Sequence, residues 1–305
     1  MTTFVLRRIL WAIPVLWIVA TITFAMMHLV PGGPFDREKK LPPEIKANIE
    51  AKYHLDKALP VQYGLYLKGL LRGDLGPSYK YLGRTVNDVI ADTLPVSMQL
   101  GLVALLVGLV VGASAGIASA VWARTALDKC SMFLATAGIS IPNFVLGAFF
   151  IQLFSHRWRL LPPALWEDAR HAILPAAALG LAPAAYIARL MRASILEVVD
   201  KDYVRTARAK GLPFTAVLWK HVLINAISPV VTILGPLTAV LVTGSFVIEF
   251  IFSVPGMGQF FITAVTNRDY PLIMGVTLVY AALIVAANLF VDVIYLLIDP
   301  RVQME

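Results

Sequence analysis

The chain is 305 residues long, with 58% hydrophobic residues, 15% charged residues and a formal net charge of +7. Because a soluble domain carries about 25% charged residues, this chain has too little polar surface for a water-exposed globule. The mean hydropathy is +0.75, and the apolar residues form the long blocks typical of membrane spans. The single cysteine, Cys130, excludes an internal disulfide framework and a multi-cysteine metal site. The basic residues lie between the apolar blocks and form no separate domain, which argues against a nucleic-acid partner.

Six apolar blocks are long enough to cross a hydrocarbon core of about 30 Å, so the sequence predicts an all-α integral membrane protein with six transmembrane helices. The first block follows a basic start, but it is long and no clear cleavage site follows it, which favours a retained span over a signal peptide. The blocks are Ile9–Val30, Met98–Trp122, Met132–Phe154, Ile173–Met191, Ile227–Phe250 and Leu272–Tyr295.

The fourth block contains two prolines, Pro175 and Pro183. Proline is tolerated in a spanning helix where neighbours satisfy the freed backbone groups. We therefore expect the fourth span to lie inside the helix bundle and not against lipid.

The distribution of lysine and arginine predicts the orientation. With a cytoplasmic N-terminus, the short outside loops hold only Arg157, Arg159, Arg170 and Arg268. The inside segments hold Arg7, Arg8, Arg124, Lys129, Arg189, Arg192, Lys201, Arg205, Arg208, Lys210, Lys220 and Arg301. An excess of positive charge inside places both termini in the cytoplasm.

This topology divides the chain into a tail with the first span (1–30), an outer segment (31–94), a core of five spans (95–298) and a cytoplasmic tail (299–305). The outer segment has helical spacing in two stretches, one with Ile45, Ile49 and Tyr53 on one face and one over Val61–Leu71. We expect it to form a helical cap on the extracytoplasmic surface.

Three glycines, Gly108, Gly112 and Gly116, recur every four residues in the second span. Small residues at this spacing predict close approach of another helix. The same stretch places Ser114 in a G-x-S-x-G pattern, the nucleophile motif of some hydrolases. That motif needs a strained strand-to-helix turn, and no histidine lies at membrane depth, so an intramembrane serine protease is only a remote alternative.

The chain contains neither a phosphate-binding loop nor a paired-histidine zinc motif, so uphill transport would need an ion gradient or an ATPase partner. An ion-coupled carrier should pair ionisable groups deep in its spans. The candidates, Glu249 and Asp292, fall at opposite ends of the membrane and cannot form one site. Interfacial positions for both are the simpler interpretation.

The loop Lys201–His221, between the fourth and fifth spans, is basic and partly apolar. Asp202 precedes a short predicted helix with Tyr203, Ala207 and Lys210 along one side. Gly211 suits the end of that helix, and Pro213 suits the start of a second one. The residues alone leave two readings open, a helix held by anionic lipid headgroups and a docking site for another protein.

At this loop the chain resembles the permease subunits of ABC importers, whose inner loop carries the pattern E-A-A-x-x-x-G. Ala207 and Gly211 match that pattern, whereas Arg205 replaces the glutamate and Thr206 the first alanine. The resemblance implies that this loop is the coupling helix, seated in a groove of an ATPase subunit. The coupling residues would be Tyr203, Arg205, Thr206, Ala207, Arg208, Lys210, Gly211, Leu212 and Pro213.

Other segments are similar to oligopeptide and dipeptide permeases, and most similar to the B subunits of oligopeptide permeases. They are Leu6–Leu10, Tyr53–Asp56, Gly73–Pro77, Gly244–Glu249, Pro255–Gly258, Asn267–Tyr270 and Asp299–Arg301. The resemblance implies the type-1 ABC importer permease fold and a non-catalytic subunit, without a cofactor of its own, in a bacterial inner membrane. Its expected substrates are short peptides, with dipeptides, murein peptides or nickel chelates as alternatives.

The family also implies partners: a second permease subunit, two ATPase subunits that bind ATP and Mg, and an extracytoplasmic peptide-binding protein, besides membrane lipid. Residues expected to line the passage are Pro175, Pro183, Glu249 and Asp292.

Overall fold

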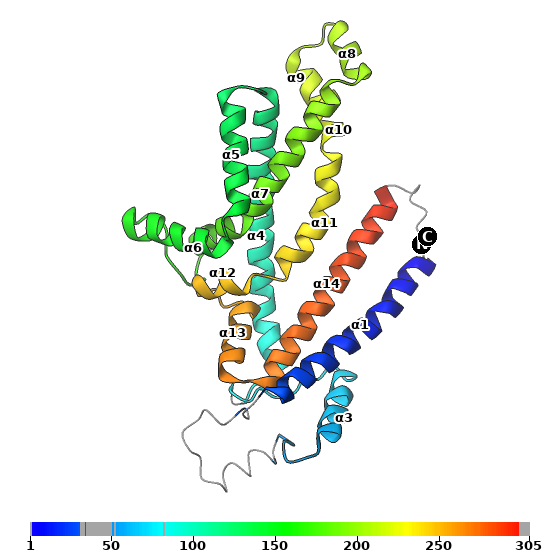
Figure 1. Ribbon diagram of the computed structural model, residues 1–305, viewed down its shortest axis with the longest axis vertical. Helices are drawn as coiled ribbons and strands as arrows, with labels where there is room; N and C mark the ends of the chain where they lie inside the picture. Colours follow the sequence, from blue (N-terminus) through cyan, green and yellow to red (C-terminus); the bar gives the residue numbers. More distant parts are fainter. Residues whose placement is uncertain (1, 31–33, 35–50, 52, 82, 299–305) are drawn as a thin grey trace. The chain divides into compact units, whose positions relative to one another are not determined.

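The computed structural model describes residues 2–30, 34, 51, 53–81 and 83–298, and side chains are described between Leu6 and Phe290 (Figure 1). All regular elements in these ranges are helices, apart from one isolated bridge between Pro77 and Thr85. The chain forms two compact units, which we describe separately. Unit 1 comprises Met1–Val96 and Pro255–Ala286, and unit 2 comprises Ser97–Val254 and Ala287–Glu305.

Within the described part of the chain, four helices are long and apolar enough to cross a membrane: α1 (Thr2–Leu29), α4 (Val86–Val121), α7 (Ala169–Val199) and α14 (Tyr270–Ile298). Two bent pairs give up to six spans. In the first, α5 (Ala126–Ser140) meets the segment Asn143–Arg157, which begins with α6 (Asn143–Phe150), at 106°. In the second, Phe214–Ala226 meets α11 (Ser228–Val242) at 47°.

The prediction of a continuous third span over Met132–Phe154 is wrong. Helix α5 ends at Ser140, and Pro142 caps the start of α6. A proline disfavours helical backbone at the residue before it, and Ile141 is extended with a ψ of 126°. The break therefore follows from Pro142.

The predicted fifth span, Ile227–Phe250, ends earlier than expected. Helix α11 ends at Val242, and Gly244 turns the chain with a φ of +81°. A separate short helix, α12 (Phe246–Ile251), follows and begins with the Ser245 side chain as its N-cap. Glycine adopts this left-handed conformation without the penalty of a Cβ.

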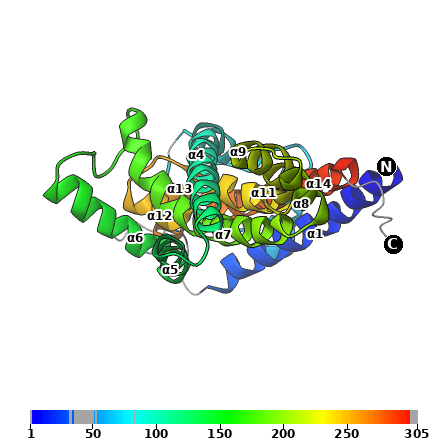
Figure 2. The same cartoon turned by 90° about the horizontal axis from the view of Figure 1, so that it is seen from above.

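Helix α7 is the centre of unit 2, and Figures 1 and 2 show α4, α5 and α11 lying around it. Of its most apolar window, 56% is buried, against 33% in α4. Pro175 and Pro183 lie within α7 and are buried, as expected for a span inside the bundle.

At the start of α7, the Asp168 carboxylate accepts from the backbone nitrogens of Arg170 (2.8 Å) and His171 (3.3 Å). The hydrogen bond with the His171 side chain, more than these backbone bonds, holds the pKa of Asp168 below its usual value.

Unit 1 contains α3 (Leu59–Leu70), which matches the predicted stretch Val61–Leu71, and α13 (Met257–Asn267). Helix α3 is tied to α1 by the Tyr63 and Thr21 hydroxyls at 2.7 Å. The buried Asp269 carboxylate accepts from the Ser78 hydroxyl and from the Tyr79 backbone at 3.1 Å. The predicted helix around Ile45 and Ile49 lies outside the described residues.

Candidate functional site

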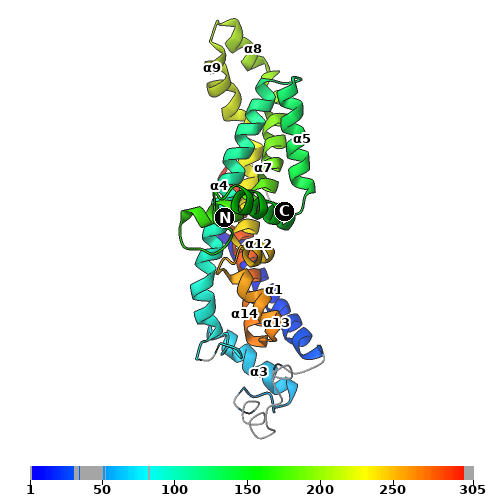
Figure 3. The same ribbon diagram turned by 90° about the vertical axis from the view of Figure 1, so that its left-hand side faces the viewer.

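The loop between the fourth and fifth predicted spans forms two short helices joined by a bend, which we call the elbow (Lys201–His221). Helix α8 (Asp202–Ala209) is followed by α9 (Phe214–Val217). Between them Gly211 has a φ of +76°, and its nitrogen donates to the Arg208 carbonyl at 2.9 Å. In Figures 1 and 3 the elbow extends beyond the ends of α4 and α5.

The inner side of the elbow belongs to the core of unit 2. Val204 is 0% exposed and Ala207 5%, and both join a cluster with Ile195 and Val198 of α7. Tyr203 and Ala207 lie one turn apart in α8, as expected, but Ala207 is buried whereas Tyr203 is 44% exposed. The apolar pair at positions i and i+3, Val204 and Ala207, is what anchors α8.

The outer side of the elbow combines exposed apolar side chains with cations. Phe214, which was not among the expected coupling residues, is 60% exposed. Of the expected residues on this side, Leu212 is 41% exposed, and Thr206, Lys210, Gly211 and Pro213 are exposed as well. Arg205 has one weak partner, with its Nη1 at 4.0 Å from the Asp202 carboxylate.

Two neighbouring cations complete the charge of this side. Among the residues that the structure describes, Arg208 forms no ion pair. Lys201 donates to Glu197 at 3.0 Å, and this hydrogen bond raises the pKa of Lys201. The outer side of the elbow is thus basic and apolar, and its ion pairs lie at the solvent-exposed surface.

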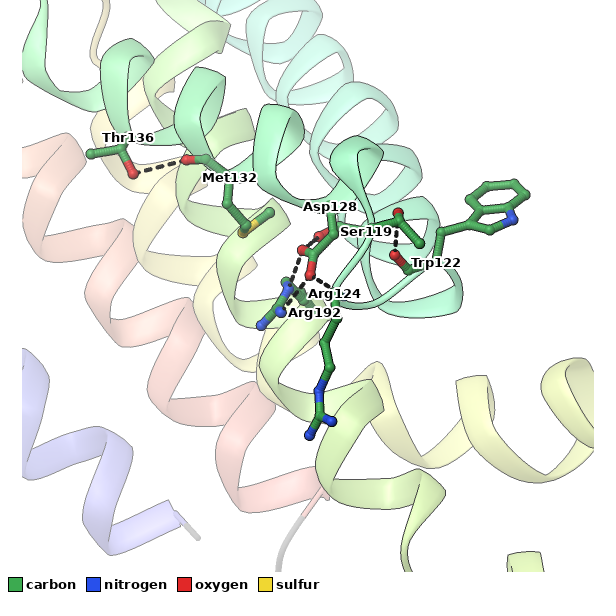
Figure 4. Close-up of polar contacts among 8 residues, drawn as sticks. Ser119, Trp122, Arg124, Asp128, Met132, Thr136 and Arg192 are labelled. Carbon is green, nitrogen blue, oxygen red and sulfur yellow. Dashed lines mark hydrogen bonds and ion pairs between the residues drawn. The ribbon is translucent and has the colours of Figure 1, made fainter.

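A buried polar cluster joins three helices at the end of unit 2 from which the elbow extends (Figure 4). The Asp128 carboxylate, on α5, accepts two hydrogen bonds from Arg192 of α7, from Nε at 2.7 Å and from Nη2 at 2.9 Å. It also accepts from the Ser119 hydroxyl of α4 at 2.5 Å and from the Arg124 backbone nitrogen at 2.8 Å. The cluster was not predicted from the sequence, in which Arg192 appears only as one of the positive charges that set orientation.

The three glycines of α4 face α7 at close range. A Cβ at Gly108 would lie 3.1 Å from the Pro183 Cβ, and one at Gly116 would lie 2.6 Å from the Ala188 carbonyl oxygen. A Cβ at Gly112 would collide with the Ala184 carbonyl oxygen. These glycines therefore allow the two helix backbones to touch.

Ser114 lies between these glycines inside the uninterrupted helix α4. The strand-to-helix turn that a G-x-S-x-G nucleophile requires is therefore not formed at this serine.

The residues expected to line a passage do not gather in one place. Pro175 and Pro183 are buried within unit 2, where Pro183 packs against Gly108. Glu249 is 0% exposed in α12, with its carboxylate over Gly244. Asp292 lies outside the residues whose side chains are described. A passage role for any of these residues stays a prediction.

Comparison with known proteins assigns the chain to a family. The family described as "Binding-protein-dependent transport system inner membrane component" matches residues 108–304, and the family of the corresponding N-terminal region matches residues 1–101. The dipeptide transport system permease protein of Bacillus subtilis is 42% identical over 306 residues, covering 100% of this chain and 99% of that protein. The oligopeptide transport system permease protein of Salmonella typhimurium is 45% identical over 305 residues, covering 99% of this chain and 100% of that protein.

Two solved structures share the fold. An amino acid ABC transporter aligns with a TM-score of 0.55 at 16% identity, over 68% of this chain and 93% of that chain. The methionine ABC transporter MetNI aligns with a TM-score of 0.52 at 17% identity, over 68% of this chain and 96% of that chain.

The fold is therefore that of a multi-pass membrane permease of the type-1 ABC importer class. The chain belongs to the family of binding-protein-dependent transport system inner membrane components, and within it to the oligopeptide and dipeptide permeases.

Proposed function

We propose that this chain is one permease subunit of an ATP-driven importer that moves short peptides across a bacterial cytoplasmic membrane by alternating access. Its support is full-length similarity, at 42% and 45% identity, to permeases named for dipeptide and oligopeptide transport. Oligopeptides are our first choice of substrate, and dipeptides fit the same relatives. Both termini lie in the cytoplasm, as the excess of positive charge in the inner loops indicates.

The proposed assembly has a second permease subunit, two ATPase subunits that bind ATP and Mg, and an extracytoplasmic binding protein that selects the peptide. The elbow is the docking site for an ATPase subunit. The observation that carries this assignment is its outer side, where Phe214 is 60% exposed beside several cations. Exposed apolar groups gathered in one place indicate an interaction surface.

The position of the elbow favours a protein partner over lipid. The turn between α4 and α5 carries Trp122, which is 53% exposed, and tryptophan is typical of the membrane–water interface. The elbow extends beyond this turn in Figures 1 and 3. Its far end, which includes α8, therefore reaches beyond the level that Trp122 marks.

Transport by the reconstituted complex tests the proposed function. Vesicles that contain the permease pair and ATPases, supplied with the binding protein, should take up a labelled peptide only when ATP reaches the ATPase side. Parallel assays with a dipeptide and a longer peptide decide between the two substrates. Uptake driven by an ion gradient in vesicles without ATPase would contradict the proposal and favour a carrier.

The exposed guanidinium of Arg205 predicts that the partner surface facing it is acidic. The family pattern has a glutamate, not an arginine, at this position. Its contact with Asp202 is long and exposed, so Arg205 remains available to another protein. Arg205→Glu should weaken ATPase binding to the purified permease at low salt, and added salt should weaken the wild-type interaction.

The exposed Arg72, which the topology places in the outer cap, gives the matched control. Arg72→Glu makes the same charge change and should leave ATPase binding at the wild-type level. Equal binding by the Arg205→Glu and wild-type proteins at low salt would show that the partner surface is not acidic.

A further inference from the structure

The polar cluster around Asp128 connects three helices, α4, α5 and α7. Ser119 is near the end of α4, Asp128 is in the first turn of α5, and Arg192 is on α7 (Figure 4). Asp128 is 4% exposed and Ser119 0%. Because the Arg192 guanidinium donates to both oxygens of the Asp128 carboxylate, this contact fixes the orientation of the two side chains as well as their distance.

One member of the cluster, Arg192, lies on α7, the helix that leads into the elbow. Arg192 is about two helical turns before the end of α7 at Val199. The backbone nitrogen of Lys201 donates to the Val198 carbonyl at 3.1 Å. Val198 belongs to the same buried cluster as Val204 of α8. These contacts join the start of α8 directly to the end of α7.

Helix α5 contacts α7 near Gly138 but leaves a cavity beside this contact. Where α4 and α7 touch through Gly112 and Gly116, a cavity of about 420 Å³ lies between them and part of α5. Its wall includes Ala115 of α4, Ser131 of α5 and Ala188 of α7.

Each member of the cluster lies three or four positions from one of these wall residues, on the same face of its own helix. Ser119 follows Ala115, Asp128 precedes Ser131, and Arg192 follows Ala188. The cluster therefore fastens α5 to α4 and α7 at the end of the cavity nearest the elbow.

We propose that Asp128 and Arg192 are positioning residues that make α4, α5 and α7 move as one body with the elbow. This inference rests on the proposed function, because it concerns how the ATPase drives transport. If the fastening is lost, the elbow and α7 still follow the ATPase, but α5 no longer follows α7. ATP is then hydrolysed without a complete change of access.

The test compares peptide imported per ATP hydrolysed in vesicles that contain wild-type or variant complexes. Asp128→Asn keeps the size of the side chain and removes the charge that orients Arg192. We expect this ratio to fall between about twofold and thirtyfold, the range typical of coupling residues, while ATP hydrolysis continues. Arg192→Lys keeps the positive charge but loses the paired hydrogen bonds to both oxygens of Asp128. This variant should fold well and give a smaller fall in the ratio of peptide imported to ATP hydrolysed.

Asp168→Asn is the matched control, since it makes the same change at the opposite end of α7, where asparagine caps a helix equally well. It should leave the ratio unchanged. A wild-type ratio in both Asp128→Asn and Arg192→Lys complexes would overturn the inference. Absence of ATP-driven uptake by the wild-type complex would instead contradict the proposed function, so the two failures are distinguishable.

Discussion

Replacing Gly211 with valine is expected to abolish ATP-dependent peptide import while the permease still reaches the membrane. The backbone φ of +76° at Gly211 suits glycine and strains a β-branched residue by about 1–3 kcal/mol. A Cβ at this position would meet no atom within 4 Å, so the effect is one of backbone conformation and not of collision. The bend between α8 and α9 would change, and the elbow would no longer fit the groove of the proposed ATPase subunit. Uptake of labelled peptide, at matched expression, measures the effect.

Gly73 provides a control with the same local geometry. Its φ is +73° and a Cβ there would also meet no atom within 4 Å, but the predicted topology places it in the outer cap. Gly73→Val should leave the co-purification of ATPase subunits intact, whereas Gly211→Val should reduce it. Normal ATP-dependent import by the Gly211→Val complex would refute the coupling role of the elbow.

Replacing Gly112 with alanine is expected to destabilise the permease by about 1–3 kcal/mol or more, the usual cost of overpacking. The added Cβ would collide with the Ala184 carbonyl oxygen and lie 2.9 Å from the Ile187 Cβ. Both atoms lie on or next to the backbone of α7, so relief requires the helices to separate. Thermal or denaturant unfolding of the detergent-solubilised protein measures the loss.

Gly138 in α5 is the matched control for this change. A Cβ there would lie 3.7 Å from the Ala185 Cβ, an ordinary contact. Gly138→Ala should be neutral or stabilise the helix by up to about 1 kcal/mol, because alanine is the better helix former. If the Gly112→Ala and Gly138→Ala proteins unfold alike, then α4 and α7 are not in the close contact described above.

Much of the fold was predictable because membrane spans and helix bends depend on local sequence. A long apolar block predicts a helix at membrane depth, and Pro175 and Pro183 within one block predict a span protected by its neighbours. The bend of the elbow followed from Gly211 and Pro213 for the same reason. Each of these features is decided by residues within a few turns of one another.

The rest depends on contacts between segments far apart in the chain. Asp128 and Arg192 are 64 residues apart, and no spacing rule relates an aspartate after the second span to an arginine at the end of the fourth. Burial of Ala207 and Val204 likewise depends on their packing against α7. The break at Pro142 was present in the sequence, but the apolar run across it concealed the change of direction.

Photo-crosslinking from the tip of the elbow tests the central claim most directly. A photoreactive residue in place of Phe214, which is 60% exposed, is compared with one in place of Phe133, which is 71% exposed on α5. The assembled complex is irradiated in its membrane, and the crosslinked chains are identified by mass spectrometry. Our account predicts crosslinks from position 214 to an ATPase subunit and none to that subunit from position 133. Crosslinks from position 214 to lipid alone would contradict it.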